Sequence, residues 1–432
     1  MTDAAAPTTE AIAPRPLGLW SATALVVGSM IGSGVFLLPA SLAPFGASSL
    51  IGWAITLGGA LLLALTFARL ASRWPQTGGP YVFARHGFGD VTGFVVAWSY
   101  WVSIWCANAA IAVAFAGSLG AVFPALTATP VRAAACALGA LWLCVGVNLA
   151  GVREAGRMQL VTTVLKLVPL VVFGCIALWF VDTSHYAPLN PSGQSLPHAV
   201  QATVALTLWA FLGLEAATVP AGAIADAQRT IPRATLLGTL LAGIATILAC
   251  SAVLGLLPAE QLKDAQAPMA DAARSLWGPA AGIGIATVAA ISCFGALNGW
   301  VLLSAQVPLA AARDGLLPAR FARLDARGTP AFGVLASSVL ASLLVLANYS
   351  HSLVQLFTFS ILLSTAATLL PYFASSAAWL RSGDRRGRIV AALALLYSLY
   401  ALLGAGGEAL AWGAVLVAAG LPVYFWRQRR AA

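Results

Sequence analysis

Two segments of the sequence place glycines and small polar residues inside long apolar runs, where they could bind a small charged solute. The first reads GSMIGSGVFLLPASLA, with Gly32, Ser33 and Gly34 near its centre. Two glycines around a serine weaken a helix and free backbone N–H groups at the start of a half-helix, where a carboxylate can bind. Close packing of helices through small residues is the alternative that this short motif leaves open.

The second segment, TLWAFLGLEAATVPAG, has Gly213 at its centre. Interruptions in corresponding helices of two halves indicate a transporter built from inverted repeats, with its binding site at the level of the breaks. We therefore expect the carboxylate of the solute at the first break and its amine at the second. Tyr100, Trp101, Trp209 and Trp300 lie on the path of such a solute, and a buried indole face can hold a cation.

Only two ionisable residues fall inside the apolar runs, Lys166 and Glu215. A charge at membrane depth is costly, so each is a functional candidate. Glu215 could simply bond backbone groups that the second break leaves open. Lys166 could exchange a proton, because burial disfavours its charged form, or it could be a fixed cation that joins the first span to the fifth.

The remaining chemistry-bearing residues do not form a site of another class. Metal and nucleophile centres need clustered His, Asp, Glu or Cys, whereas the other acids and all four histidines fall in loops or at the ends of apolar runs. The six cysteines lie within apolar runs, which predicts no disulfide framework and no zinc site. A channel would need repeated polar rings along a pore. We expect alternating access, without a cofactor or metal, rather than an enzyme or a channel.

The elements that must position these residues are membrane-spanning helices. The 432 residues are 60% hydrophobic and 9% charged, with a mean hydropathy of +0.88, so the chain needs lipid as its solvent. We expect an all-α membrane protein in which residues 1–16 form a disordered tail. Twelve apolar runs are long enough to cross a bilayer. They cover approximately residues 17–43, 47–70, 91–121, 131–150, 156–181, 197–223, 234–257, 279–312, 331–348, 353–380, 388–404 and 408–426.

The net charge of +9 indicates membrane orientation rather than nucleic-acid binding. Nineteen of the 23 lysines and arginines fall near the termini or in alternate loops, while the intervening loops carry only Arg132, Lys263 and Arg274. Because Lys and Arg concentrate on the cytoplasmic side, both termini are expected in the cytoplasm. That orientation requires an even number of spans.

The sequence resembles the amino acid–polyamine–organocation superfamily, and within it the bacterial basic amino acid antiporters of the arginine/agmatine type. The likeness runs from about Gly18 to Tyr424. It rests on several motifs in the expected order, namely GSMIGSGVFLLPASLA, PQTGGPYVFARHGFG, LWAFLGLEAAT, DAQRTIPRAT and GWVLLSAQVPLAAARDGLLPARFARLDARGTP. The resemblance implies a LeuT-like fold of two inverted five-helix repeats, residues 17–181 and 182–380, with helices 1 and 6 broken. Residues 381–432 would form two further helices and a basic tail. It also implies an inner-membrane permease that can form a homodimer.

The resemblance also implies roles for individual residues. Those expected to touch the substrate are Ile31, Gly32, Ser33, Gly34, Ser103, Ile104, Asn108, Ile111, Trp209, Trp300 and Leu362. Among them, Ser33 and its glycines would bind the carboxylate, and Trp300 would be the cation–π platform. The gating residues would be Trp209 and Leu212, with Tyr100 in an outer aromatic gate and Glu215 as a proton-sensitive acid.

Three positions depart from the antiporter pattern. Ile111 stands where those antiporters have a methionine, and apolar residues near Ile361 and Leu362 replace a serine. Lys166 instead resembles the lysine of sodium-independent members of the superfamily, whose ammonium takes the place of a sodium ion, so proton coupling would involve Lys166 and Glu215. We expect a cationic, arginine-like amino acid to be exchanged for its amine, with proton-coupled transport or export of neutral amino acids as the alternative.

Overall fold

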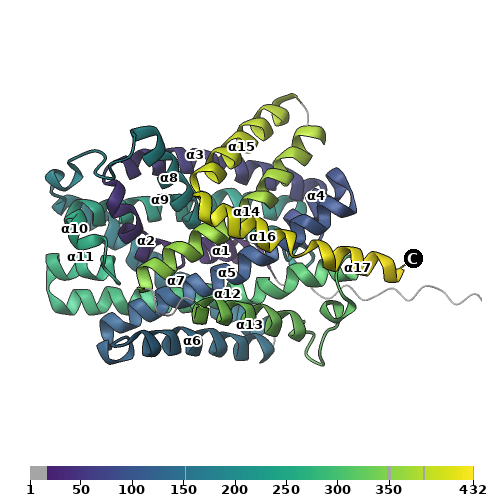
Figure 1. Cartoon of the computed structure of the whole chain (residues 1–432), viewed down its shortest axis with the longest axis horizontal. Helices are drawn as coiled ribbons and strands as arrows, with labels where there is room; N and C mark the ends of the chain where they lie inside the picture. The colour runs from purple at the N-terminus through teal and green to yellow at the C-terminus, as the bar shows by residue number, and fades with distance from the viewer. Residues whose placement is uncertain (1–16, 151, 348–351, 383–384, 432) are drawn as a thin grey trace, which may run out of the picture.

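The computed structural model describes residues 17–150, 152–347, 352–382 and 385–431, and the tail expected in residues 1–16 lies outside them. Throughout this part of the chain the elements are helices, with one isolated bridge between Leu17 and Ile224 and no sheet. Figure 1 shows the helices packed into one bundle. The predicted all-α fold is confirmed.

The membrane-spanning helices lie close to where the hydrophobic pattern predicts them. Ten helices are long and apolar enough to cross a bilayer. Two shorter apolar helices, Leu196–Phe211 and Ala331–Ala347, stand where the sixth and ninth spans are expected. The predicted count of twelve is reached when both of these are counted as spans.

The bounds of the helices follow the chain in three groups. The first group contains α1 (Leu19–Met30), α2 (Gly34–Leu42), α3 (Ser48–Arg73), α4 (Pro80–Phe88), α5 (Asp90–Val122), α6 (Pro130–Ala150) and α7 (Val152–Ala177). The second contains α8 (Leu196–Leu208), α9 (Ala227–Leu256), α10 (Ala259–Leu262), α11 (Pro268–Trp277), α12 (Pro279–Arg313), α13 (Ala331–Ala347) and α14 (Leu353–Ser382). The last contains α15 (Arg385–Gly404), α16 (Gly407–Ala418) and α17 (Leu421–Ala431).

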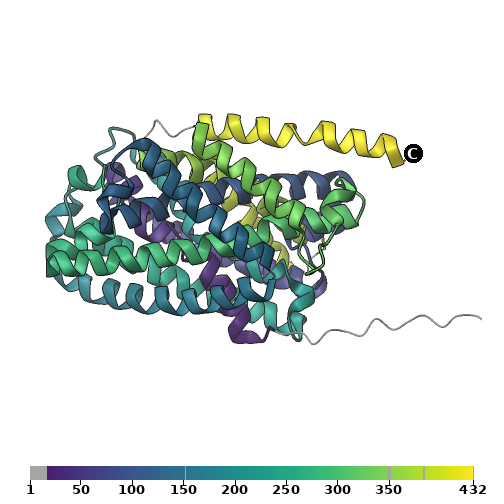
Figure 2. The same cartoon turned by 90° about the horizontal axis from the view of Figure 1, so that it is seen from below.

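The helices that carry the predicted site lie at the centre of the bundle. The most apolar windows of α1–α2 and α5 are 94% and 89% buried, whereas that of α16–α17 is only 22% buried. Figure 2 shows α16 and α17 along one edge of the molecule. A helix that is apolar all round and enclosed by protein can hold polar groups away from lipid, which suits α1, α2 and α5 to binding.

Both predicted breaks are present, and they touch. α1 ends at Met30, Ile31 is extended, and α2 begins at Gly34. The second break is longer than predicted, because α8 already ends at Leu208 and the chain then runs through short 3₁₀ turns up to α9. Gly213 has a φ of +101°, and a Cβ at this position would lie 2.7 Å from the Cβ of Ser29. Glycine is therefore needed there both for its backbone conformation and for contact between the breaks.

Candidate functional site

The first break contains a buried polar side chain that has no partner among the described residues. Ser33 is 1% exposed, and its hydroxyl has no hydrogen-bond partner in the part of the chain that the structure describes. The first N–H groups of a helix have no intrahelical acceptor, and they attract negative charge. The start of α2 at Gly34 is therefore suited to a carboxylate, as predicted. Gly34 also allows close packing, since a Cβ there would lie 2.9 Å from Cδ1 of Trp209.

Side chains from two other helices satisfy the carbonyl groups that the end of α1 leaves open. Lys166 of α7 is fully buried, and its Nζ donates to the carbonyl oxygen of Gly28 over 2.6 Å. The indole N–H of Trp300, on α12, donates to the carbonyl oxygen of Ser29 over 3.2 Å. A cation is stabilised at a helix C-terminus, so Lys166 has a structural role in this state. Proton exchange by Lys166 stays a prediction.

Glu215 lies at the centre of a hydrogen-bond network across the second break. One carboxylate oxygen accepts from the hydroxyl of Tyr100 over 2.6 Å. The other accepts from Tyr372 over 2.5 Å and from the N–H of Gly213 over 3.2 Å. The carboxylate therefore does bond a backbone group of the break, and it also joins α5 to α14. Glu215 and Lys166 are the two charged side chains that are buried among the described residues, as the sequence predicts.

Two features of this network were not predicted. Tyr100, expected in an outer gate, is fully buried ten residues after the start of α5, and its hydroxyl donates to Glu215. The gating roles of both residues stay predictions. Tyr372 is missing from the prediction. Its position inside an apolar run gave no signal, because only the fold shows that α14 brings it to Glu215.

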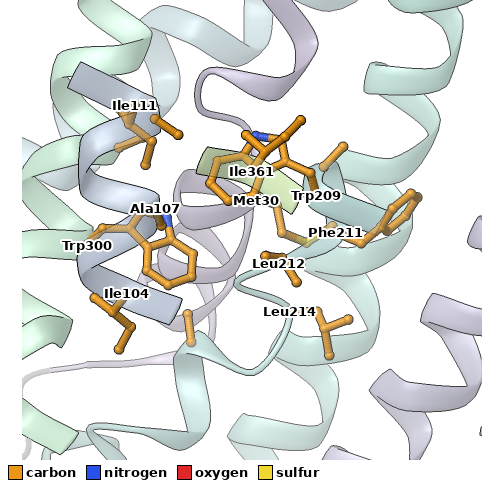
Figure 3. Packing of buried hydrophobic residues seen from close by; sticks show 14 of the residues in the cluster. Met30, Ile104, Ala107, Ile111, Trp209, Phe211, Leu212, Leu214, Trp300 and Ile361 are labelled. Atoms are coloured by element: carbon orange, nitrogen blue, oxygen red, sulfur yellow. The ribbon is translucent and has the colours of Figure 1, made fainter. Parts of the chain in front are cut away.

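The second break also contains hydrogen-bond acceptors to which no group donates in the described chain. In the described chain, the carbonyl oxygens of Ala210, Leu212 and Leu214 accept no hydrogen bond. Leu212 and Leu214 are buried beside Trp209, as Figure 3 shows. Unpaired carbonyl oxygens in a buried segment attract a donor, so this break can bind an ammonium group. The arrangement agrees with the expected division between a carboxylate end and an amine end.

Asn108 is a buried polar residue of α5, on the same helix as Ile104 and Ile111. It is fully buried, and neither its amide nitrogen nor its amide oxygen has a partner in the described chain. Figure 3 shows Ile104 and Ile111 of α5 beside Trp300. Buried amides almost always have partners, so an unpaired one points to a ligand.

α14 contributes differently from the prediction. Ile361 is fully buried and faces the site in Figure 3. Leu362 is half-buried and packs against the main core and against the small cluster of Ala205, Ala366 and Ala405, and its contact with substrate stays a prediction. The same helix also carries Ser364, whose hydroxyl donates to the carbonyl oxygen of Ser103 over 2.8 Å. The prediction missed this serine, and the carbonyl of Ser103 is thereby occupied.

A cluster of polar residues lies at the end of α12, next to a cavity. Asp314, which follows α12, accepts from the hydroxyl of Tyr81 and from Arg85, each over 2.6 Å. Arg85 also pairs with Asp90 over 2.7 Å. Burial and the hydrogen bond to Asp314 raise the pKa of Tyr81 above its ordinary value, so its hydroxyl stays a donor. A cavity of about 430 Å³ extends from Asp314 to Gly299, the neighbour of Trp300.

Comparisons with known proteins agree on the nature of the chain. Residues 17–424 match the family model described as amino acid permease. The putrescine transporter PotE of Escherichia coli K12 is 31% identical over 94% of this chain and 95% of its own length. The cadaverine/lysine antiporter of the same strain is 33% identical, covering 92% and 91%. A putative arginine/ornithine antiporter of Bacillus subtilis 168 is 32% identical, covering 89% and 91%.

Two solved structures share the fold at low sequence identity. One is Mhp1, a nucleobase-cation-symport-1 family transporter, with a TM-score of 0.56 and 15% identity over 97% of this chain and 94% of that one. The other is a Na⁺-coupled sialic acid symporter, with a TM-score of 0.60 and 12% identity over 90% of this chain and 89% of that one. At this identity the likeness shows the fold alone.

Proposed function

The chain belongs to the amino acid permease family, and from this premise we propose that it exchanges a cationic, arginine-like amino acid for the corresponding amine. It is a multi-pass membrane protein that transports an amino acid or amine, and it is not an enzyme. The proposed part concerns the substrate and the exchange. The observation that supports it best is that Ser33 in the first break and Asn108 on α5 are buried polar residues with no partner in the described part of the chain, in a protein that also buries Trp209 and Trp300.

Each part of such a substrate has a matching group. The carboxylate binds at Ser33 and the start of α2, and the α-amine binds at the carbonyl groups of the second break. The cationic side chain lies on the face of Trp300, and Asn108 accepts one of its N–H groups. A decarboxylated amine keeps all of these contacts except the first, so one site can carry both partners of an exchange.

The relatives support this class of substrate. Their names describe a putrescine transporter, a cadaverine/lysine antiporter and a putative arginine/ornithine antiporter. Each name contains a diamine or a cationic amino acid. Lys166 places a fixed ammonium group against α1, which disfavours a sodium ion beside the first break.

A second candidate is proton-coupled transport or export of neutral amino acids. It is favoured by Ile111 and Ile361, which make the wall beside Asn108 apolar. Glu215 is the one buried carboxylate among the described residues, and two tyrosines and Gly213 already donate to its oxygens. It is therefore not free to pair with a cationic side chain of a substrate. A neutral side chain with an amide group would satisfy both atoms of Asn108, whereas a cation satisfies only the oxygen.

We also propose the setting in which the chain works. The loops that carry most of the Lys and Arg face the cytoplasm of a bacterium, and both termini lie on that side of the inner membrane. Residues 17–181 and 182–380 form the two inverted repeats, which agrees with a broken helix at the first position of each half. The chain can form a homodimer, as the sequence resemblance implies.

Counterflow in proteoliposomes tests the exchange. Vesicles containing the purified chain are preloaded with agmatine, with cadaverine or with no amine, and entry of labelled arginine, lysine and leucine is followed with and without a pH gradient. Acceleration of arginine or lysine entry by internal amine supports the proposal. Entry of leucine that depends on the pH gradient and ignores internal amine would instead establish the neutral alternative.

A further inference from the structure

A lateral cavity outside the substrate site lies between α5, α13, α14 and α16. Its volume is about 740 Å³. Two of its apolar walls are open to the outside of the protein, because Leu343 of α13 is 56% exposed and Trp412 of α16 is 52% exposed. Exposed apolar side chains on the flank of membrane-spanning helices face the hydrocarbon of the bilayer. The cavity therefore opens toward lipid.

Polarity changes along the length of this cavity. Glu408 lies in the first turn of α16 and Gln355 in the first turn of α14, so both polar residues stand at one end. Leu416 and Leu363 follow eight residues later on the same two helices, which places them about 12 Å further along the helix axes. The cavity thus has a charged end at the level of the helix starts and an apolar end in the membrane interior. A molecule with a polar head and an apolar tail would match this arrangement.

One tryptophan of α5 in the wall of the cavity has an indole N–H without an acceptor among the described residues. The N–H of Trp98 donates to the carbonyl oxygen of Leu416 over 2.8 Å, and the N–H of Trp101 donates to the hydroxyl of Ser337 over 2.7 Å. Trp105, one turn further along α5, lines the cavity and is 7% exposed, but its N–H has no partner within the described ranges. A buried N–H group without a partner requires an acceptor, which an occupant of the cavity can supply.

We propose that the cavity binds a phospholipid with a primary ammonium headgroup, of the phosphatidylethanolamine class. Its ammonium group pairs with Glu408, which has no ion-pair or hydrogen-bond partner in the described part of the chain. An ester carbonyl accepts the N–H of Trp105, and acyl chain fills the space between Leu343 and Leu363. A choline headgroup has no N–H to donate, and an anionic glycerol headgroup is repelled by the carboxylate, so the site distinguishes headgroups.

The lipid would contact two helices that also carry residues of the candidate site. Its walls include α5, which carries Asn108, and α14, which carries Tyr372. A lipid between these helices and α13 therefore sets how easily they shift. Binding itself does not depend on which substrate is carried, so its test is separate from the test of the proposed exchange.

Native mass spectrometry of the purified full chain tests the site. The protein is titrated in detergent with phosphatidylethanolamine, phosphatidylcholine or phosphatidylglycerol of matched acyl chains. We expect one phosphatidylethanolamine per chain to be retained in preference to the other two. Glu408→Gln should weaken its retention roughly fivefold, as the loss of one partly exposed charged hydrogen bond does. Trp105→Phe removes only the unpaired N–H from a buried ring and should also weaken retention.

A matched control and the contrary outcomes complete the test. Glu260→Gln changes an exposed acid on α10 that pairs with Lys263, away from the cavity, and should leave retention unchanged. Equal retention of the three lipids by the unaltered chain, or equal loss in the Glu260 variant, overturns the proposal. Conversion of a dimer to a monomer by Glu408→Gln, without a change in lipid retention, shows that a second copy covers the cavity and also overturns it. If the Trp105→Phe variant does not fold, the Glu408→Gln variant decides the result, because Glu408 is exposed.

Discussion

The indole N–H of Trp300 donates to the carbonyl oxygen of Ser29 over 3.2 Å, so the indole ring is fixed to the last turn of α1. Ser29 also lies against Gly213 of the second break. One residue of α1 therefore joins this indole to the second break. We expect a movement of α1 to shift both, so that binding at one place would drive a change elsewhere.

Two substitutions of Trp300 separate the aromatic face from the hydrogen bond. Trp300→Ala removes both and should raise the KM for arginine or lysine about 5- to 30-fold, the effect of losing a desolvated cation–π contact of about 1–2 kcal/mol. Trp300→Phe keeps an aromatic face and should raise it less. Uptake of a neutral amino acid is measured in parallel. An equal loss for cationic and neutral substrates would remove the cation–π role.

Replacement of Asn108 should have opposite effects on stability and transport. Asn108→Leu removes two buried polar atoms without partners and keeps a similar volume, so the substrate-free protein should gain about 1–3 kcal/mol of unfolding free energy. The same change should abolish the stabilisation by added substrate. Thermal unfolding in detergent, with and without arginine, measures both effects. A loss of stability in the substrate-free protein would show that Asn108 is a structural residue.

Lys166 can be tested for proton coupling apart from its structural role. Lys166→Met keeps the aliphatic stem but leaves the carbonyl oxygen of Gly28 without its partner, so unfolding free energy should fall by about 1–3 kcal/mol. If the lysine also exchanges a proton, the dependence of uptake on external pH should flatten. Thr163→Val, one turn away on α7, removes a hydroxyl that donates to the carbonyl oxygen of Ala24 over 3.4 Å, so it controls for the loss of an uncharged bond between α7 and α1. A lower stability with an unchanged pH profile would assign Lys166 a structural role alone.

Glu215→Gln tests the network at the second break. A neutral amide offers one oxygen where the carboxylate offers two, so Tyr100 and Tyr372 cannot both keep their bonds. We expect slower exchange and a profile of rate against pH that is flatter than that of the unaltered protein. Tyr372→Phe removes one bond but leaves the carboxylate, so it should slow exchange without flattening the profile. An unchanged profile in the Glu215→Gln variant would show that Glu215 does not sense protons.

Loss of the bonds to Asp314 should change how often the nearby cavity opens. Asp314→Asn weakens the bonds to Tyr81 and Arg85 that tie α4 to the end of α12. Because the pair is partly exposed, stability should fall by only about 1 kcal/mol or less. The nearby cavity should nevertheless open more often, which accelerates labelling of a cysteine placed at Gln306 by a water-soluble thiol reagent. An unchanged labelling rate would exclude a gating role for this cluster.

Hydrophobic runs were sufficient to predict most of the fold, because spans in lipid must be long and apolar. The sequence also led to Ser33, Asn108 and Trp300, and the structure brings them to the centre of the bundle. It did not predict the partners Tyr372 and Asp314. They meet Glu215 and Tyr81 from segments more than a hundred residues away, and no local pattern records such a pairing. Leu362 stays a predicted substrate contact, although Ile361, one residue earlier and about 100° round the helix, is the more buried of the two.

The buried polar groups of Ser33 and Asn108 have a consequence for the return of the carrier without a bound solute. Both groups are buried and have no partner among the described residues, so a site that closes around them is costly when empty and favourable when a solute is bound. Under the proposed function, the empty carrier would then rarely return. Transport in one direction would wait for a molecule moving in the other, so hydrogen bonds that only a bound solute completes would favour one-for-one exchange.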